Sequence, residues 1–159
     1  MALAPEDERH LLRSIELARQ ARSNGNHPFG SLILDASGQV VVEAENSVVT
    51  GRDVAGHAEL NVVRAAGKQL DPAIFEGTTL FTSTEPCAMC SGAIYWAGIA
   101  RVVYALGGDE LNAMLKDMPG VPTLALSCRA VFARGSREVD VSGPHLFEEA
   151  VAVHEGFWS

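Results

Sequence analysis

The chain has 159 residues, of which 47% are hydrophobic and 20% charged, and it contains no low-complexity tract or internal repeat. This composition excludes a disordered or fibrous protein, and the length predicts a single domain over residues 1–159. Its formal net charge of -8 repels phosphate backbones, and its 12 Lys and Arg are scattered, which argues against a long nucleic acid as a partner. The N-terminus is acidic, and no apolar run reaches the roughly 20 residues that span a bilayer, so we expect no leader, no membrane contact and a cytoplasmic location.

Helical and extended patterns alternate in the first half of the chain. Apolar residues recur every three to four positions over residues 6–25, which predicts a helix. Two runs rich in Val, Ile and Leu flank the turn sequence DASGQ, which predicts an antiparallel hairpin over residues 29–46. The helical spacing then returns and predicts a second helix over residues 57–70, with His57 at its start.

The middle of the chain continues this alternation. A buried-strand run over residues 78–84 leads to a predicted helix over residues 87–98. A strand over residues 101–106 and a helix over residues 109–118 follow. Right-handed crossovers between such strands make this part of the sheet parallel, with helices on both faces. The predicted fold class is therefore α/β, a three-layer α/β/α sandwich with a mixed central sheet.

The last quarter of the chain has a weaker pattern. Residues 123–141 are compatible with one or two strands, and the layout of residues 121–142 stays open. A terminal helix is predicted over residues 144–158. Cys128, which has no partner motif near it, is interpreted as a small buried apolar residue.

Two other cysteines form a close pair at the start of a predicted helix. Cys87 and Cys90 share one helix face, and the positive end of the helix dipole favours their thiolate forms, which are good ligands for zinc. A C-x-x-C pair alone is also compatible with a redox pair or with core packing. His57 offers a third ligand, because the intervening stretch fits one helix, one loop and one strand. Three ligands leave a fourth position open for water, which predicts one catalytic Zn²⁺ per chain.

Glu59 lies two residues after the predicted histidine ligand. A carboxylate beside zinc-bound water can take the proton of the water and deliver it to a leaving group. The alternative is a helix acid that the dipole stabilises. H-x-E followed by P-C-x-x-C is typical of zinc deaminases, so Glu59 is the predicted catalytic residue.

The motifs HAEL and EPCAMC resemble the cytidine and deoxycytidylate deaminase superfamily over residues 28–108. The chain is most similar to the branch of guanine deaminases, tRNA adenosine deaminases and fungal-type cytosine deaminases. This resemblance implies a cytidine deaminase-like fold and the zinc-dependent hydrolytic deamination of a small nucleobase or nucleoside.

The resemblance also implies substrate-binding residues. Asn46 matches an asparagine whose amide contacts the ring, and Phe29 matches an aromatic residue near the ring; a turn residue and core packing are the respective alternatives. The main chain near Glu85 is expected to contact the ring. Asp117 falls near the position of a carboxylate that guanine deaminases use, although the surrounding motif departs from theirs.

In this branch the C-terminal segment closes over an active site, often the active site of the neighbour in a swapped homodimer. We expect residues 143–159 to act in this way, with Phe157 and Trp158 covering a site or packing on their own domain. Guanine or a related aminated purine is the first substrate hypothesis, followed by cytosine, cytidine or an aminated triazine. A tRNA adenosine deaminase and an inactive zinc-stabilised binding module are the remaining alternatives.

Overall fold

The computed structural model describes residues 2–69 and 71–159. Within these residues, one mixed sheet has the strand order β2-β1-β3-β4-β5. Its strands are β1 (Gly30–Leu34), β2 (Val40–Glu45), β3 (Thr79–Thr84), β4 (Arg101–Leu106) and β5 (Asp140–Ser142). The hairpin strands pair antiparallel with each other and with β3, whereas β3, β4 and β5 run parallel. The predicted hairpin and the mixed sheet are confirmed.

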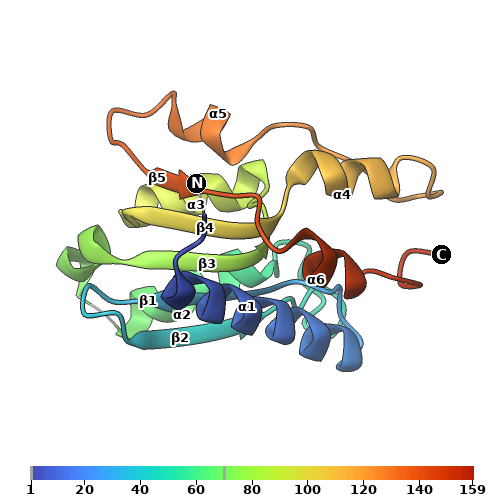
Figure 1. Cartoon of the computed structure of the whole chain (residues 1–159), viewed down its shortest axis with the longest axis horizontal. Helices are drawn as coiled ribbons and strands as arrows, with labels where there is room; N and C mark the ends of the chain where they lie inside the picture. The colour runs from blue at the N-terminus through green and yellow to red at the C-terminus, as the bar shows by residue number, and fades with distance from the viewer. Residues whose placement is uncertain (1, 70) are drawn as a thin grey trace.

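Helices cover both faces of the sheet (Figure 1). One face carries α1 (Pro5–Ser23) and α6 (Phe147–Ala152). The other face carries α2 (Ala58–Gln69) and α3 (Ala88–Ala97), and α5 (Cys128–Phe132) packs on α3. The remaining helical elements are the 3-10 helix η1 (Pro72–Gly77) and α4 (Gly108–Leu115). The three-layer α/β/α prediction is therefore confirmed; the last residue of the predicted helix 57–70 lies outside the described residues.

The hydrophobic core is divided by the sheet into two clusters. The cluster below α1 and α6 includes Leu11, Ile15, Leu32, Phe81 and Val103. The cluster below α2, α3 and α5 includes Ile33, Val62, Leu80, Ile94 and Phe132. Burial of each such side chain contributes about 1.5–3 kcal/mol. The second cluster therefore holds α2 and α3 against the sheet, and the first holds α1 and α6 against the opposite face. Among the described residues, no helix has the length and apolar character needed to cross a bilayer.

Residues 123–141, whose pattern was compatible with one or two strands, contribute to one strand, the three-residue β5. The helix α5, which was not predicted, precedes it. The N-cap residue of α5, Ser127, accepts a hydrogen bond at its side chain from the backbone N–H of Ala130 at 3.1 Å. Cys128 and Phe132, one helical turn apart in α5, are both buried. The helix therefore forms because it packs against α3, which the apolar composition did not reveal. The prediction that Cys128 is buried is confirmed.

The predicted terminal helix over residues 144–158 is too long. Leu146 has a left-handed backbone conformation with φ of 50°, so α6 begins only at Phe147. It ends at Ala152, and turns follow. The left-handed residue at the N-cap is not visible in the apolar periodicity on which the prediction rested.

Candidate metal and catalytic site

Three ligand side chains meet where β3 ends and two neighbouring helices begin. Cys87 is the N-cap residue of α3, and Cys90 lies in the first turn of that helix. His57 immediately precedes α2, and its carbonyl oxygen accepts the hydrogen bond of the Asn61 N–H at 2.9 Å. Because His57 stands at this cap position and outside the helix, its side chain can point across to α3.

The spacing of the three ligand atoms fits zinc. The His57 Nδ1 lies 3.6 Å from the Sγ of Cys87 and 3.6 Å from the Sγ of Cys90, and all three atoms lie within 4.8 Å of one another. Tetrahedral zinc with bonds of about 2.0–2.1 Å to nitrogen and 2.3 Å to sulfur separates these atoms by about 3.6 Å. The predicted ligand set of His57, Cys87 and Cys90 is therefore brought together with the right dimensions.

The electrostatics of the cysteine pair favour a cation. The hydrogen bond from Cys90 lowers the pKa of the Cys87 thiol to about 4. The same bond, together with burial, raises the pKa of Cys90. The hydrogen bond with Cys87 also raises the pKa of His57. The pair thus shares a proton that a metal ion displaces on binding, which makes metal affinity increase with pH.

Glu59 lies beside the ligand cluster without belonging to it. Its side chain is only 5% exposed, and its Oε1 accepts a hydrogen bond from the Thr82 hydroxyl at 2.9 Å. Burial raises the pKa of this carboxyl above its ordinary value. A solvated helix acid would have neither feature, and raised pKa values are typical of groups that transfer protons near neutral pH.

A cavity of about 100 Å³ adjoins Glu59. Its walls include Phe29, Thr84 and Leu111, together with Glu59, Glu85 and the ligands His57 and Cys87. A larger cavity of about 400 Å³ shares His57, Glu85, Cys87 and Leu111 with it and opens towards α4 and residues 122–127. We call the cavity beside Glu59 the inner cavity and the larger one the outer cavity; the inner cavity brings Glu59 next to the ligands His57 and Cys87.

Glu85 braces the wall of this cavity. One carboxylate oxygen accepts the N–H of Gly108 at 2.8 Å, and the other accepts the N–H of Cys128 at 2.9 Å. These are the first residues of α4 and α5, where unpaired N–H groups favour a negative charge. Glu85 therefore joins three segments of the site, a duty that sequence reasoning missed.

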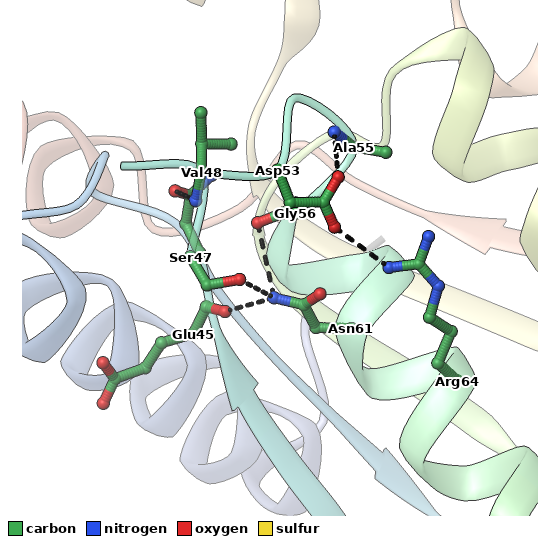
Figure 2. A network of polar contacts seen from close by, with 9 residues as sticks. Glu45, Ser47, Val48, Asp53, Ala55, Gly56, Asn61 and Arg64 are labelled. Atoms are coloured by element: carbon green, nitrogen blue, oxygen red, sulfur yellow. Dashed lines mark hydrogen bonds and ion pairs between the residues drawn. The ribbon is translucent and has the colours of Figure 1, made fainter. Parts of the chain in front are cut away.

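A polar network holds the loop that leads to the histidine ligand (Figure 2). The Asn61 Nδ2, one turn into α2, donates to the Glu45 carbonyl and the Ser47 hydroxyl at 2.9 Å each. At the start of this loop, Asn46 is buried and its Oδ1 accepts the N–H of Val48 at 3.1 Å. Asn46 is not among the residues that line the two cavities. Sequence reasoning missed Asn61, although an asparagine inside a helix is a signal worth testing.

We expect Asn61→Ala to loosen this loop and misplace His57. Zinc affinity should fall about tenfold, as for other residues that orient a metal ligand, and the free energy of unfolding should fall by about 1–3 kcal/mol. Competition with a chelator and thermal unfolding measure the two effects. Arg64→Ala is the control, because Arg64 bonds to the same loop through an exposed 3.5 Å contact with Asp53. Equal effects of the two substitutions would contradict the role given to Asn61.

The remaining predicted residues lie outside the cavity walls. Asp117 is exposed in the turn after α4 and lines neither cavity. Trp158 packs on its own domain, with its ring centroid 6.2 Å from that of Phe29, and its Nε1 donates to the His154 Nδ1 at 3.1 Å. Arg22 of α1 holds the same segment by donating to main-chain carbonyls of the tail. The C-terminal segment thus backs Phe29, one wall of the inner cavity.

This fold and this ligand set define a class of protein, the zinc-dependent nucleobase and nucleoside deaminases. Residues 4–106 match the model of the cytidine and deoxycytidylate deaminase zinc-binding region. The chain belongs to the cytidine and deoxycytidylate deaminase family.

Three similar proteins extend this result. The chain is 39% identical over 156 residues to a probable cytosine deaminase of Schizosaccharomyces pombe, with 98% of this chain and 94% of that protein covered. It is 40% identical over 99 residues to a guanine deaminase of Bacillus subtilis, with 62% and 63% covered. The structure of a guanine deaminase from Nitrosomonas europaea matches 96% of this chain and 84% of its own, with a TM-score of 0.76 and 28% identity. The predicted family and fold are confirmed.

Proposed function

We propose that the protein removes the exocyclic amino group of a small nucleobase or nucleoside by hydrolysis, with release of ammonia. Guanine or a related aminated purine is the first substrate in this proposal. The observation that carries it is the position of Glu59, buried in the wall of a cavity that it shares with two of the three metal ligands.

Glu59 is the proton carrier in the proposed mechanism. Bound zinc supplies the Lewis acidity that lowers the pKa of water to about 7. The Glu59 carboxylate accepts the proton of the attacking water and then donates it to the departing amino group. The Thr82 hydroxyl fixes one oxygen of this carboxylate, and burial raises its pKa towards the range in which it can both accept and donate.

Other residues hold the base in the proposed complex. Phe29 offers an aromatic face in the cavity wall. Its carbonyl oxygen accepts the N–H of Asn46 at 3.0 Å, so the two residues move together. Because the Asn46 Oδ1 is held by Val48, its amide nitrogen is the group that remains to contact a base. Asp117 and Trp158 lie outside the cavity walls of the single chain, and we give them no direct contact here.

Cytosine is the second candidate substrate. The S. pombe protein, a probable cytosine deaminase, covers nearly the whole of this chain, including the C-terminal segment that backs Phe29. The two guanine deaminases support the purine instead. Ammonia release by the zinc-loaded protein from guanine, guanosine, adenine, cytosine, cytidine and ammeline separates the candidates, because pocket shape rather than the zinc site selects the base.

A tRNA substrate has little support. The chain carries a net charge of -8, and two of its arginines already hold the fold together. The Arg129 guanidinium donates to the Tyr104 hydroxyl and to the carbonyl of Val141. The Arg137 guanidinium donates to the carbonyls of Tyr95 and Ile99. Both groups are thus engaged within the protein, which leaves fewer donors for phosphates along an RNA.

The proposal includes a homodimer and a reducing, cytoplasmic location. Thiolate ligands such as Cys87 stay available for zinc where disulfides do not form. The helix α3 exposes Met89 and 84% of Trp96, and Met89 also lines the outer cavity with the exposed Val54 and Leu124. Apolar side chains of this size beside a cavity mark an interaction surface, for which we propose a second copy of the chain.

We expect the protein to sediment as a dimer and Trp96→Glu to sediment as a monomer, because a carboxylate at the centre of an apolar interface is costly to bury. Sedimentation velocity at several protein concentrations measures this. Val40→Glu, an exposed apolar residue on the edge strand β2, is the control and should remain dimeric. A wild-type protein that is monomeric at every concentration would contradict the dimer.

A further inference from the structure

Thr84 has a buried hydroxyl group without a hydrogen-bond partner. It is the last residue of β3 and is 2% exposed. Its Oγ1 makes no hydrogen bond to any of the described residues, and Thr84 lines the inner cavity with Glu59. The other unpaired buried side-chain atom among the described residues is Nε2 of His154, which does not line the cavity.

The buried hydroxyl groups of residues 78, 82 and 83, along the same strand and just before it, are all bonded. Thr82 faces the same side of the sheet, since side chains alternate along a strand, and its hydroxyl donates to Glu59. The Ser83 hydroxyl accepts the N–H of Gly30 at 3.1 Å, and the Thr78 hydroxyl donates to the Phe75 carbonyl at 2.6 Å. Thr84 is therefore the exception, and a buried hydroxyl without a partner costs free energy that a ligand can restore.

The rest of the cavity wall offers the substrate few uncommitted polar side chains. Phe29 and Leu111 are apolar. Both carboxylate oxygens of Glu85 are bonded to backbone N–H groups of α4 and α5. His57 and Cys87 face the metal, and Glu59 serves the proton transfer in the proposed mechanism. This leaves Thr84 as the wall residue whose polar side-chain group has no partner among the described residues.

We propose that the Thr84 hydroxyl is a specificity-determining group that hydrogen-bonds a ring nitrogen of the substrate. This inference rests on the proposed function and deepens it. A hydroxyl both donates and accepts, so it serves a ring N–H or a ring lone pair. Such a contact selects heteroaromatic bases that carry the polar atom and rejects analogues that lack it, because those leave the buried hydroxyl unpaired.

The test compares Thr84→Val, which removes the hydroxyl at nearly constant shape, with Thr84→Ser, which keeps it. The zinc-loaded whole chain is assayed with its best base and with the single deaza analogues of that base, in each of which one ring nitrogen is replaced by CH. The wild type should lose about tenfold in kcat/KM with one analogue, Thr84→Val should show no such difference, and Thr84→Ser should restore it.

A stability measurement separates recognition from a structural role. Thr84→Val should unfold at the same temperature as the wild type or higher, because no hydrogen bond within the protein is lost. Thr78→Val is the matched control, because its hydroxyl is bonded and lies away from the site. Its unfolding temperature should fall by about 2–4 °C. A fall in the unfolding temperature of Thr84→Val as large as that of the control would overturn the inference.

The outcomes also separate this inference from the proposed function. A wild type that deaminates a base while Thr84→Val discriminates among the analogues in the same way would overturn only the role of Thr84. Calorimetric titration of the bases into zinc-loaded Glu59→Ala measures recognition without turnover. A protein that neither binds nor deaminates any base would overturn the proposed function and the Thr84 inference together.

Discussion

Glu59→Gln should lower deaminase activity by about 10²–10⁴-fold while the protein keeps one zinc per chain, because general acid–base groups contribute an effect of this size. The glutamine side chain has nearly the same shape, and its carbonyl oxygen can still accept the Thr82 hydroxyl hydrogen bond. Burial of an ionisable carboxyl is unfavourable, so the variant should unfold at the same or a higher temperature than the wild type.

Steady-state assays, zinc analysis and thermal unfolding of the same preparation measure these three properties. Glu16→Gln provides the control, since Glu16 is an exposed residue of α1 that pairs with Arg19. Its activity should equal that of the wild type. Retained activity in Glu59→Gln would show that another group carries the proton.

Cys90→Ser should weaken zinc binding by more than about 100-fold. Loss of a residue that only orients a ligand costs about 10–100-fold, and Cys90 supplies a ligand atom itself. Because a bound metal stabilises the folded chain by mass action, by about 4 kcal/mol when free zinc is 1,000 times its Kd, the variant should also lose the stabilisation that added zinc gives the wild type.

Chelator competition and thermal unfolding with and without zinc test this expectation. Cys128→Ser is the matched control, because Cys128 is equally buried but lies outside the ligand group. It should unfold at a lower temperature yet bind zinc as the wild type does. Zinc-dependent stability in Cys90→Ser equal to that of the wild type would remove Cys90 from the site.

In the wild type, zinc affinity should decrease as pH falls, since the raised pKa values of His57 and Cys90 make protons compete with the metal.

The metal site could be predicted because the residue types and their spacing along the chain indicate zinc ligands. Cys87 and Cys90 lie at helical spacing behind a buried strand, and His57 precedes the helix one crossover earlier. The sheet topology then brings the two helix starts together, because α2 packs on β1 and β2 and lies directly against α3. Long periodic elements such as α1 were predictable for the same reason, since a buried stripe recurs along them.

Features that depend on packing could not be predicted. The helix α5 is short, and its first N–H is held by Glu85, a residue 43 positions away in the chain. The network around Asn61 joins a helix to a loop, and nothing in its local sequence names the partners. Asp117 is exposed in the turn after α4, and its predicted contact with substrate stays a prediction.

The predicted substrate-binding residues lie at different places relative to the inner cavity. Phe29 and Glu85 line the inner cavity, whereas Asn46 is buried next to Phe29 without lining it. Trp158 reaches the cavity only through Phe29. The sequence could not predict that the Thr84 hydroxyl is unpaired, because this depends on the hydrogen bonds of all its neighbours in the fold. Contacts to a base therefore remain proposals for these residues, and only variants assayed with substrate decide them.

The most direct test of the account is ammonia release by the zinc-loaded protein over the panel of bases and nucleosides, with Glu59→Gln as the blank. We predict strong release from one free base, guanine first and cytosine second, and none above the blank from the variant. Silence across the panel from a protein that holds one zinc per chain, or equal release by the variant, would contradict it.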